Sequence, residues 1–262
     1  MGTNRLSPGR FPAKVHRHLF AYAVSLAGGL AVWQLLAMQF SALIFPPPTR
    51  VLARLFDLIG SGTLPAALWG SLGVLLLGYG LAVLVGFPLG IALGRYRALS
   101  VASEPVINAI YAVPPVAMVP FLIIWFGLFL QAQVALVFVM AVFEIVITMR
   151  AGMRTIEPRY LDAARSFGAG PATILRAVVI PATLPYAMTA LRIGFVRALN
   201  GTITAQLLLA ASFIGALMKQ SMLRFDTAGL LALVVLLSLI GLGVQEGLKT
   251  LEARLMPWHI RP

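Results

Sequence analysis

One carboxyl side chain stands in the middle of a strongly apolar stretch of the sequence. Glu144, between Phe143 and Ile145, lies inside the apolar run 134–149. In a membrane interior a charge is costly, so such residues face the inside of a helix bundle or an aqueous path and pair with other polar groups. Glu144 is therefore a candidate for lining a translocation pathway or relaying protons, and equally for a structural partner of an arginine or an amide.

A second group of polar residues lies within the apolar run 185–211. Arg192 and Asn200 are eight positions apart, which is close to two helical turns and places them on one face of a helix. Arg197 and Gln206 belong to the same run. These four side chains are candidates for a translocation pathway, although arginines in such runs also snorkel toward an interface or pair with a neighbouring helix.

The sequence does not indicate the chemistry of an enzyme. Cysteine is absent, and the histidines, His16, His18 and His259, stand near the two ends of the chain, far from any cluster of carboxylates. We find no pairing of a nucleophile with a base and no Gly-x4-Gly-Lys-Ser/Thr loop to cradle phosphates. We expect no catalytic residues, no metal site and no cofactor bound by this chain.

The composition places these polar residues in a membrane. Hydrophobic residues make up 60% of the chain and charged residues only 11%, with a mean hydropathy of +0.94, whereas a soluble domain averages roughly 25% charged residues. The net charge of +12 could suggest nucleic-acid binding, but the bases stand in short blocks between apolar runs. We predict an all-α integral membrane protein that does not bind nucleic acid.

Six apolar runs organise the chain, and we expect each to form a membrane span. They cover approximately 19–40, 68–93, 104–125, 134–149, 185–211 and 228–244. Prolines at 114, 115 and 120 should break the third run, and neighbouring helices must then satisfy the carbonyl groups that the break leaves without partners. The predicted organisation is a tail over 1–18, a transmembrane domain over 19–256 that includes a polar loop over 150–181, and a tail over 257–262.

The basic residues are unequally divided between the two ends of these spans. Six spans place both termini on one side, and most of the 20 Lys and Arg residues fall there, in the tails, after the second span and in the loop 150–181. The loops on the opposite side hold Arg50, Arg54, Lys219 and Arg224. Because positively charged loops stay in the cytoplasm, we predict that both termini and the loop 150–181 are cytoplasmic.

The loop 150–181 has a pattern that a simple connection does not need. Pro158 favours a helix start, and Gly168 favours a left-handed helix end. A second helix is expected over 172–180, and Pro181 and Pro185 should break it before the fifth span.

The first of these helices should present an apolar face. Leu161, Ala164 and Phe167 recur at helical spacing between charged residues. We predict that they form one apolar knob on the water side of the membrane, suited to a groove on another protein.

The same loop resembles a known family. Its string Asp-Ala-Ala, three residues, Gly, nine residues, Val-Val-Ile-Pro runs from Asp162 to Pro181. It is similar to the EAA motif of ATP-binding-cassette importer permeases, which reads Glu-Ala-Ala, three residues, Gly, nine residues, Ile-x-Leu-Pro. Every spacing is kept, with Asp for Glu, Val for Ile and Ile for Leu.

Further stretches, at 86–94, 113–117, 124–127 and 190–194, look like the sulfonate, nitrate and taurine branch of this family. The resemblance covers about 46–258. It fails at Glu144, where the family more often shows Phe-Phe-Pro, and at Ala205-Gln206, where it more often has Ala-Glu. The polarity of the pathway therefore differs from that of the usual sulfonate permease.

The resemblance implies a type I importer permease, with a MetI-like fold, in the bacterial inner membrane. Such an importer has two permease chains, here expected to be a homodimer, two cytoplasmic ATPase subunits that hold ATP and Mg, and an extracytoplasmic binding protein. A coupling helix over 159–167 would insert into the ATPase and transmit its closure as a rocking motion. The residues implied in coupling are Arg159, Tyr160, Leu161, Asp162, Ala163, Ala164, Arg165, Phe167 and Gly168.

Several alternatives remain at this point. The resemblance favours a small anion such as a sulfonate, nitrate or taurine as substrate, but related permeases serve pyrimidine vitamin precursors, riboflavin and aromatic acids. The alternative function is an ATP-independent secondary transporter or channel in which Glu144 relays protons.

Overall fold

The structure, a computed structural model, describes residues 12–209 and 211–256, which form helices joined by turns and contain no strand. Along the chain these are α1 (Pro12–Ala37), α2 (Pro48–Gly60), α3 (Thr63–Arg95), α4 (Arg97–Tyr111), the 3-10 helix η1 (Pro115–Met118), α5 (Val119–Phe126), α6 (Leu130–Arg154), α7 (Pro158–Ser166), α8 (Pro171–Ile174), the π-helical turn η2 (Leu175–Val179), α9 (Ile180–Leu208), α10 (Phe213–Leu223) and α11 (Thr227–Leu255). The predicted all-α class is confirmed. The predicted C-terminal tail 257–262 lies outside the described residues.

In the described residues, each of the six predicted runs falls largely on helix. In the described part of the chain, four helical segments are long and apolar enough to cross a membrane: α3, α6, Pro171–Leu208 and α11. The prolines of the third run act as predicted, because α4 and the η1–α5 segment are bent by 89° and together supply at most one further span. The apolar part of α1, Ala21–Ala37, is shorter, although the whole helix of 26 residues extends about 39 Å.

The centre of the bundle is the packing of α3 against α6 and of α6 against α9. Glycines on α3 allow the first of these contacts. A Cβ atom added to Gly90 would lie 2.5 Å from Cβ of Met149, and one added to Gly86 would lie 2.9 Å from Cγ2 of Ile145. Small residues of this kind let two helix backbones approach closely in lipid. The polar residues of α6 and α9 are therefore held by a tightly packed pair of helices.

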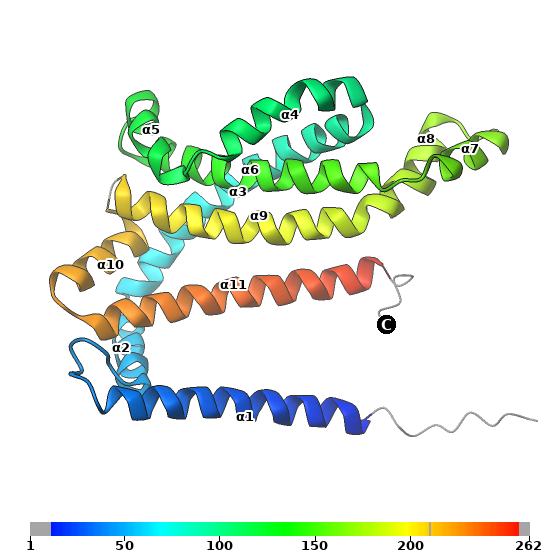
Figure 1. The fold of residues 1–262 in the computed structure, drawn as a ribbon. Helices are drawn as coiled ribbons and strands as arrows, with labels where there is room; N and C mark the ends of the chain where they lie inside the picture. The colour runs from blue at the N-terminus through cyan, green and yellow to red at the C-terminus, as the bar shows by residue number, and fades with distance from the viewer. Residues whose placement is uncertain (1–11, 210, 257–262) are drawn as a thin grey trace, which may run out of the picture.

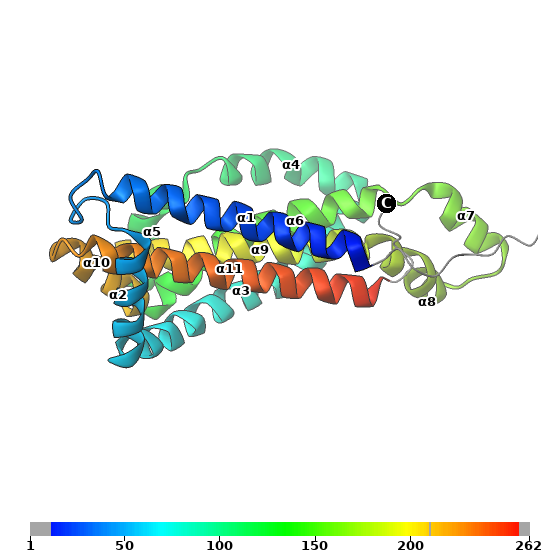
Figure 2. The same cartoon turned by 90° about the horizontal axis from the view of Figure 1, so that it is seen from below.

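Different helices lie at the two ends of the bundle. The start of α1, the end of α11 and the α7–α8 segment lie at one end, whereas α2, α5 and α10 lie at the other (Figures 1 and 2). Helix α2 crosses the bundle transversely in both views. The structure thus places α7 and α8 at the same end as the start of α1 and the end of α11, although at most five of the six predicted runs meet the length and apolarity of a span in the described residues.

The expected break at Pro181 and Pro185 is wrong. Residues Pro171–Leu208 form one continuous helical segment. The π-helical turn Leu175–Val179 ends two residues before Pro181, and such turns re-satisfy backbone groups that a proline leaves without a donor. The second helix of the loop therefore continues directly into the fifth span. A displacement of the loop can move that span, because no break in the helix separates them.

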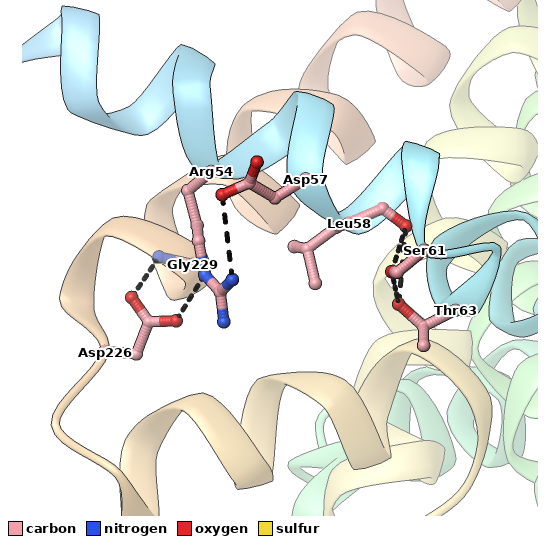
Figure 3. Close-up of polar contacts among 7 residues, drawn as sticks. All are labelled: Arg54, Asp57, Leu58, Ser61, Thr63, Asp226 and Gly229. Atoms are coloured by element: carbon pink, nitrogen blue, oxygen red, sulfur yellow. Dashed lines mark hydrogen bonds and ion pairs between the residues drawn. The ribbon is translucent and has the colours of Figure 1, made fainter.

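At the end opposite α7, a charged contact ties α2 to α11 (Figure 3). Asp226 caps α11, because its Oδ1 accepts a hydrogen bond of 2.9 Å from the Gly229 amide. Its Oδ2 accepts a bond of 2.8 Å from Nε of Arg54 on α2, and Asp57 lies 3.9 Å from the same guanidinium. Burial opposes ionisation of Asp226, but the Gly229 amide and the charges of Arg54 and Arg50 outweigh it, so its pKa lies below the usual value.

The turn between α2 and α3 is closed by hydroxyl groups (Figure 3). Ser61 Oγ donates to the carbonyl of Leu58 at 3.1 Å and shares a hydrogen bond of 2.9 Å with Thr63 Oγ1. Together with the Asp226 contact, this turn fixes the direction in which the transverse helix α2 meets the spans.

Candidate functional site

The loop predicted to couple to a partner forms an elbow, which we define as Pro158–Ile174. Helix α7 begins at Pro158, where the missing amide of proline costs no helical hydrogen bond. It ends at Ser166, and the turn that follows contains Gly168, whose φ of 76° is left-handed. The Gly168 amide donates to the Arg165 carbonyl at 2.8 Å, and the Ala169 amide donates to the Ala164 carbonyl at 3.1 Å. This is the Schellman arrangement of a helix end, as the glycine predicted.

The apolar face of α7 differs from the prediction. Leu161 and Ala164 are half-buried, and Leu161 borders an open cavity of about 500 Å³ whose other walls include Ile174 and Leu175. Phe167 instead is 91% exposed, because it follows the last helical residue as the C-cap. The predicted single knob of three residues is therefore wrong. Leu161 faces the second helix of the elbow across this cavity, and Phe167 with the exposed Tyr160 forms the outward apolar surface.

The charged residues of α7 pair locally and remain exposed. Arg165 Nη1 lies 3.0 Å from Asp162 Oδ1, and Arg159 pairs with Glu157. The Arg159 guanidinium also lies 5.2 Å from the centre of the Tyr160 ring. Ala163 is exposed between them. Exposed ion pairs add little to stability, so these side chains can change partners at low cost.

Inside the bundle, Glu144 has an arginine partner. Arg197 Nη2 on α9 lies 2.7 Å from Glu144 Oε1 on α6, and the hydroxyl of Tyr111, at the end of α4, donates to the same oxygen at 3.0 Å. The Glu144 side chain is 13% exposed. The three residues line a cavity of about 200 Å³ together with apolar side chains such as Val113 and Met140. The structure thus joins α4, α6 and α9 at one polar point.

Arg192 and Asn200 lie on a different face of α9. Arg192 Nη2 is 3.3 Å from Glu252 Oε2 on α11, and Asn200 is exposed in a groove of about 670 Å³ between α9 and α11. Their predicted common face is confirmed, because both are directed at α11. Arg197 does not belong to this face of α9, because it pairs with Glu144 on α6.

Gln206 occupies a third position. It is wholly buried, and its Oε1 accepts hydrogen bonds from Ser71 Oγ at 2.9 Å and from the Gly215 amide at 3.2 Å. Ser71 Oγ in turn accepts from the Ile214 amide at 3.2 Å. These bonds join α3, α9 and α10. The five pathway candidates therefore fall in three separate places, and only Glu144 and Arg197 contact each other.

Sequence reasoning missed several partners of the charged residues. Nothing in the sequence pattern indicated that Tyr111 or Glu252 would be a partner of a charged residue. The ion pair between Arg150 Nη2 and Glu104 Oε2, which are 2.6 Å apart, was also not predicted. For this last pair a signal existed, since both residues stand at the ends of apolar runs on the predicted cytoplasmic side. Among the residues described here, no group of three His, Cys, Asp or Glu could hold a metal ion.

Comparison with known proteins places this arrangement in a family. Residues 86–256 match the family model described as binding-protein-dependent transport system inner membrane component. The chain is 32% identical over 242 residues to the taurine transport system permease protein of Escherichia coli (strain K12), covering 90% of this chain and 88% of that protein. It is 26% identical over 258 residues to the nitrate import permease protein of Leptolyngbya laminosa, covering 95% and 92%.

Solved structures show the same fold. A chain of the MetNI methionine ABC transporter in an inward-facing conformation matches with a TM-score of 0.62 at 20% identity, covering 71% of this chain and 93% of that one. The predicted MetI-like permease fold is thereby confirmed. With its apolar spanning helices, the molecule is a multi-pass membrane protein with the role of a transport subunit. The chain belongs to the family of binding-protein-dependent transport system inner membrane components, the permease subunits of ATP-binding-cassette transporters.

Proposed function

We propose that this permease is driven by a separate cytoplasmic ATPase that grips the elbow. The observation that carries the proposal is the outward apolar surface of Tyr160 and Phe167 on an otherwise charged helix. A fully exposed phenylalanine gains by entering a groove on another protein, and its charged neighbours are held only by exposed pairs. ATP and Mg would lie on the ATPase, and this chain would bind neither.

The connections of the elbow support a mechanical role. Helix α7 follows α6 after a short turn, and the elbow's second helix continues through η2 into α9 without a break. A displacement of α7 therefore acts on α6 and α9 together. The packing of α6 against α9 is second only to that of α3 against α6. In the proposed cycle, closure of the ATPase moves this pair as a rigid body and alternates access to the pathway.

Three kinds of partner would complete the assembly. We propose a homodimer of this chain, two ATPase subunits and an extracytoplasmic binding protein in a bacterial inner membrane, with both termini in the cytoplasm. The distribution of the basic residues supports this orientation. A small sulfonate-like anion is the proposed substrate, because the relatives include permeases named for taurine, aliphatic sulfonates and nitrate.

Co-purification with the ATPase encoded beside this chain tests the proposal. Gly168→Pro should abolish association with the ATPase and leave membrane insertion intact, because proline cannot adopt the φ of 76° that the turn uses. Gly170→Ala is the matched control, since Gly170 has a φ of −71° and open space around it. Normal association of the Gly168→Pro variant, or uptake by the purified chain without any ATPase, would contradict the proposal.

A further inference from the structure

The Glu144–Arg197 pair sits at a depth where charges are rare. Glu144 lies near the middle of α6 and Arg197 near the middle of α9. Yet the Arg197 side chain is 47% exposed in the single chain. A half-exposed guanidinium in contact with lipid tails would cost several kcal/mol. This face of α9 must therefore meet an aqueous path or another protein surface.

The pair also has unused binding capacity. A guanidinium has five N–H donors and a carboxylate has about four acceptor positions, while the ion pair here joins one nitrogen to one oxygen and Tyr111 adds one bond. The adjoining cavity of about 200 Å³ is lined mainly by apolar side chains. Since a water molecule takes up about 30 Å³ of liquid, this space suits a compound of a few non-hydrogen atoms.

We propose that Glu144 and Arg197 form a transient binding site for a small zwitterion that carries an ammonium group and a sulfonate or carboxylate group. On entry of the ligand, the ammonium group takes the place of Arg197 beside Glu144, and the acidic group takes the place of Glu144 beside Arg197. Tyr111 keeps Glu144 oriented during the exchange. No covalent bond forms or breaks. This inference rests on the proposed function, and it revises the proposed substrate from a simple sulfonate-like anion to a compound whose acidic group is accompanied by an ammonium group.

The balance of charge favours a zwitterion over a simple anion. One ion pair is replaced by two, so the net charge of the site stays at zero throughout. A bare anion such as nitrate would add one negative charge beside Glu144, and in a surrounding of low dielectric this repulsion is strong. A charge-neutral exchange also keeps binding weak enough for release, which transport through a pathway requires.

A direct binding measurement on the full chain in lipid nanodiscs tests the inference. The probes are taurine, which is a zwitterion, and 1-propanesulfonate, which has the same shape with a methyl group in place of the ammonium group. Wild type should bind taurine at least about tenfold more tightly, a difference of about 1.4 kcal/mol. Glu144→Gln should bring the two affinities close together, and Arg197→Gln should abolish binding of both.

A second ion pair between spans supplies the control. Glu252 pairs with Arg192 across α9 and α11 and does not line this cavity, so Glu252→Gln should leave the ratio of the two affinities unchanged. Equal affinities in wild type, absence of taurine binding, or an unchanged ratio in a folded Glu144→Gln variant would overturn the inference. Association with the ATPase, measured separately on wild type, tells such a failure apart from a failure of the proposed function.

Discussion

The elbow and the Glu144–Arg197 pair both contain oppositely charged residues, but in opposite surroundings. On the elbow, Asp162 and Arg165 are three residues apart and open to water. In the bundle, Glu144 and Arg197 come from different spans and meet where a lone charge would be costly. The elbow's charges are therefore exchangeable contacts, whereas the inner pair is a structural requirement that a ligand can only replace with equivalent charges.

The largest expected effect comes from removing one member of the inner pair. Arg197→Leu leaves Glu144 with the Tyr111 hydroxyl but without a positively charged partner, and should lower the stability of the bundle by about 3 kcal/mol. The double variant Arg197→Leu with Glu144→Leu should recover most of that loss, because no charge is then left alone. Unfolding in detergent would measure both. Equal loss in the single and double variants would show that the pair is not coupled.

The Asp226 contact should have a smaller effect that depends on pH. Its folded-state pKa lies below the ordinary value of 3.8, so the stabilisation is present above pH 3.8 and is lost as the pH falls through the folded-state value. Asp226→Asn keeps an oxygen that can cap α11 but loses the ion pair with Arg54, so it should cost about 1 kcal/mol at neutral pH and remove this acid dependence. Thermal unfolding between pH 6 and pH 3 would test it. Asp57→Asn is the matched control, because Asp57 lies farther from Arg54 at 3.9 Å.

A change at the turn of the elbow should cost about 1 kcal/mol locally. Gly168→Ala forces a side chain into the left-handed region, and the elbow should become more sensitive to protease while unfolding of the bundle is unchanged. In contrast, Gly170→Ala should behave as wild type. If both variants were cleaved at the wild-type rate, the turn would not depend on the left-handed glycine.

The smallest effect should come from the exposed charges of the elbow. Asp162→Asn breaks the pair with Arg165 in the surrounding water and should change stability by less than about 0.5 kcal/mol. The same variant should weaken association with the ATPase if Asp162 contacts it. A loss of stability as large as that of Arg197→Leu would remove the contrast between the two regions.

The same contrast explains what could be predicted from the sequence. Pro158 and Gly168 act through bonds to their near neighbours, so the helix and its end were predictable. The continuous helix through Pro181 was not, because the π-helical turn that accommodates it depends on the packing of the whole segment. The partner of Glu144 could be anticipated as an arginine or an amide, but the choice of Arg197 and the part of Tyr111 follow from how three separate helices pack.

We propose that the elbow is the contact through which an ATPase moves the bundle. A photoreactive amino acid placed at position 167 in the assembled transporter tests it directly. Leu223 is the matched control position, since it is 75% exposed and is the last residue of α10, which lies at the opposite end of the bundle (Figure 1). We predict a cross-linked product with the ATPase from position 167 and none from position 223. The absence of that product at position 167, or equal products at both positions, would contradict the claim.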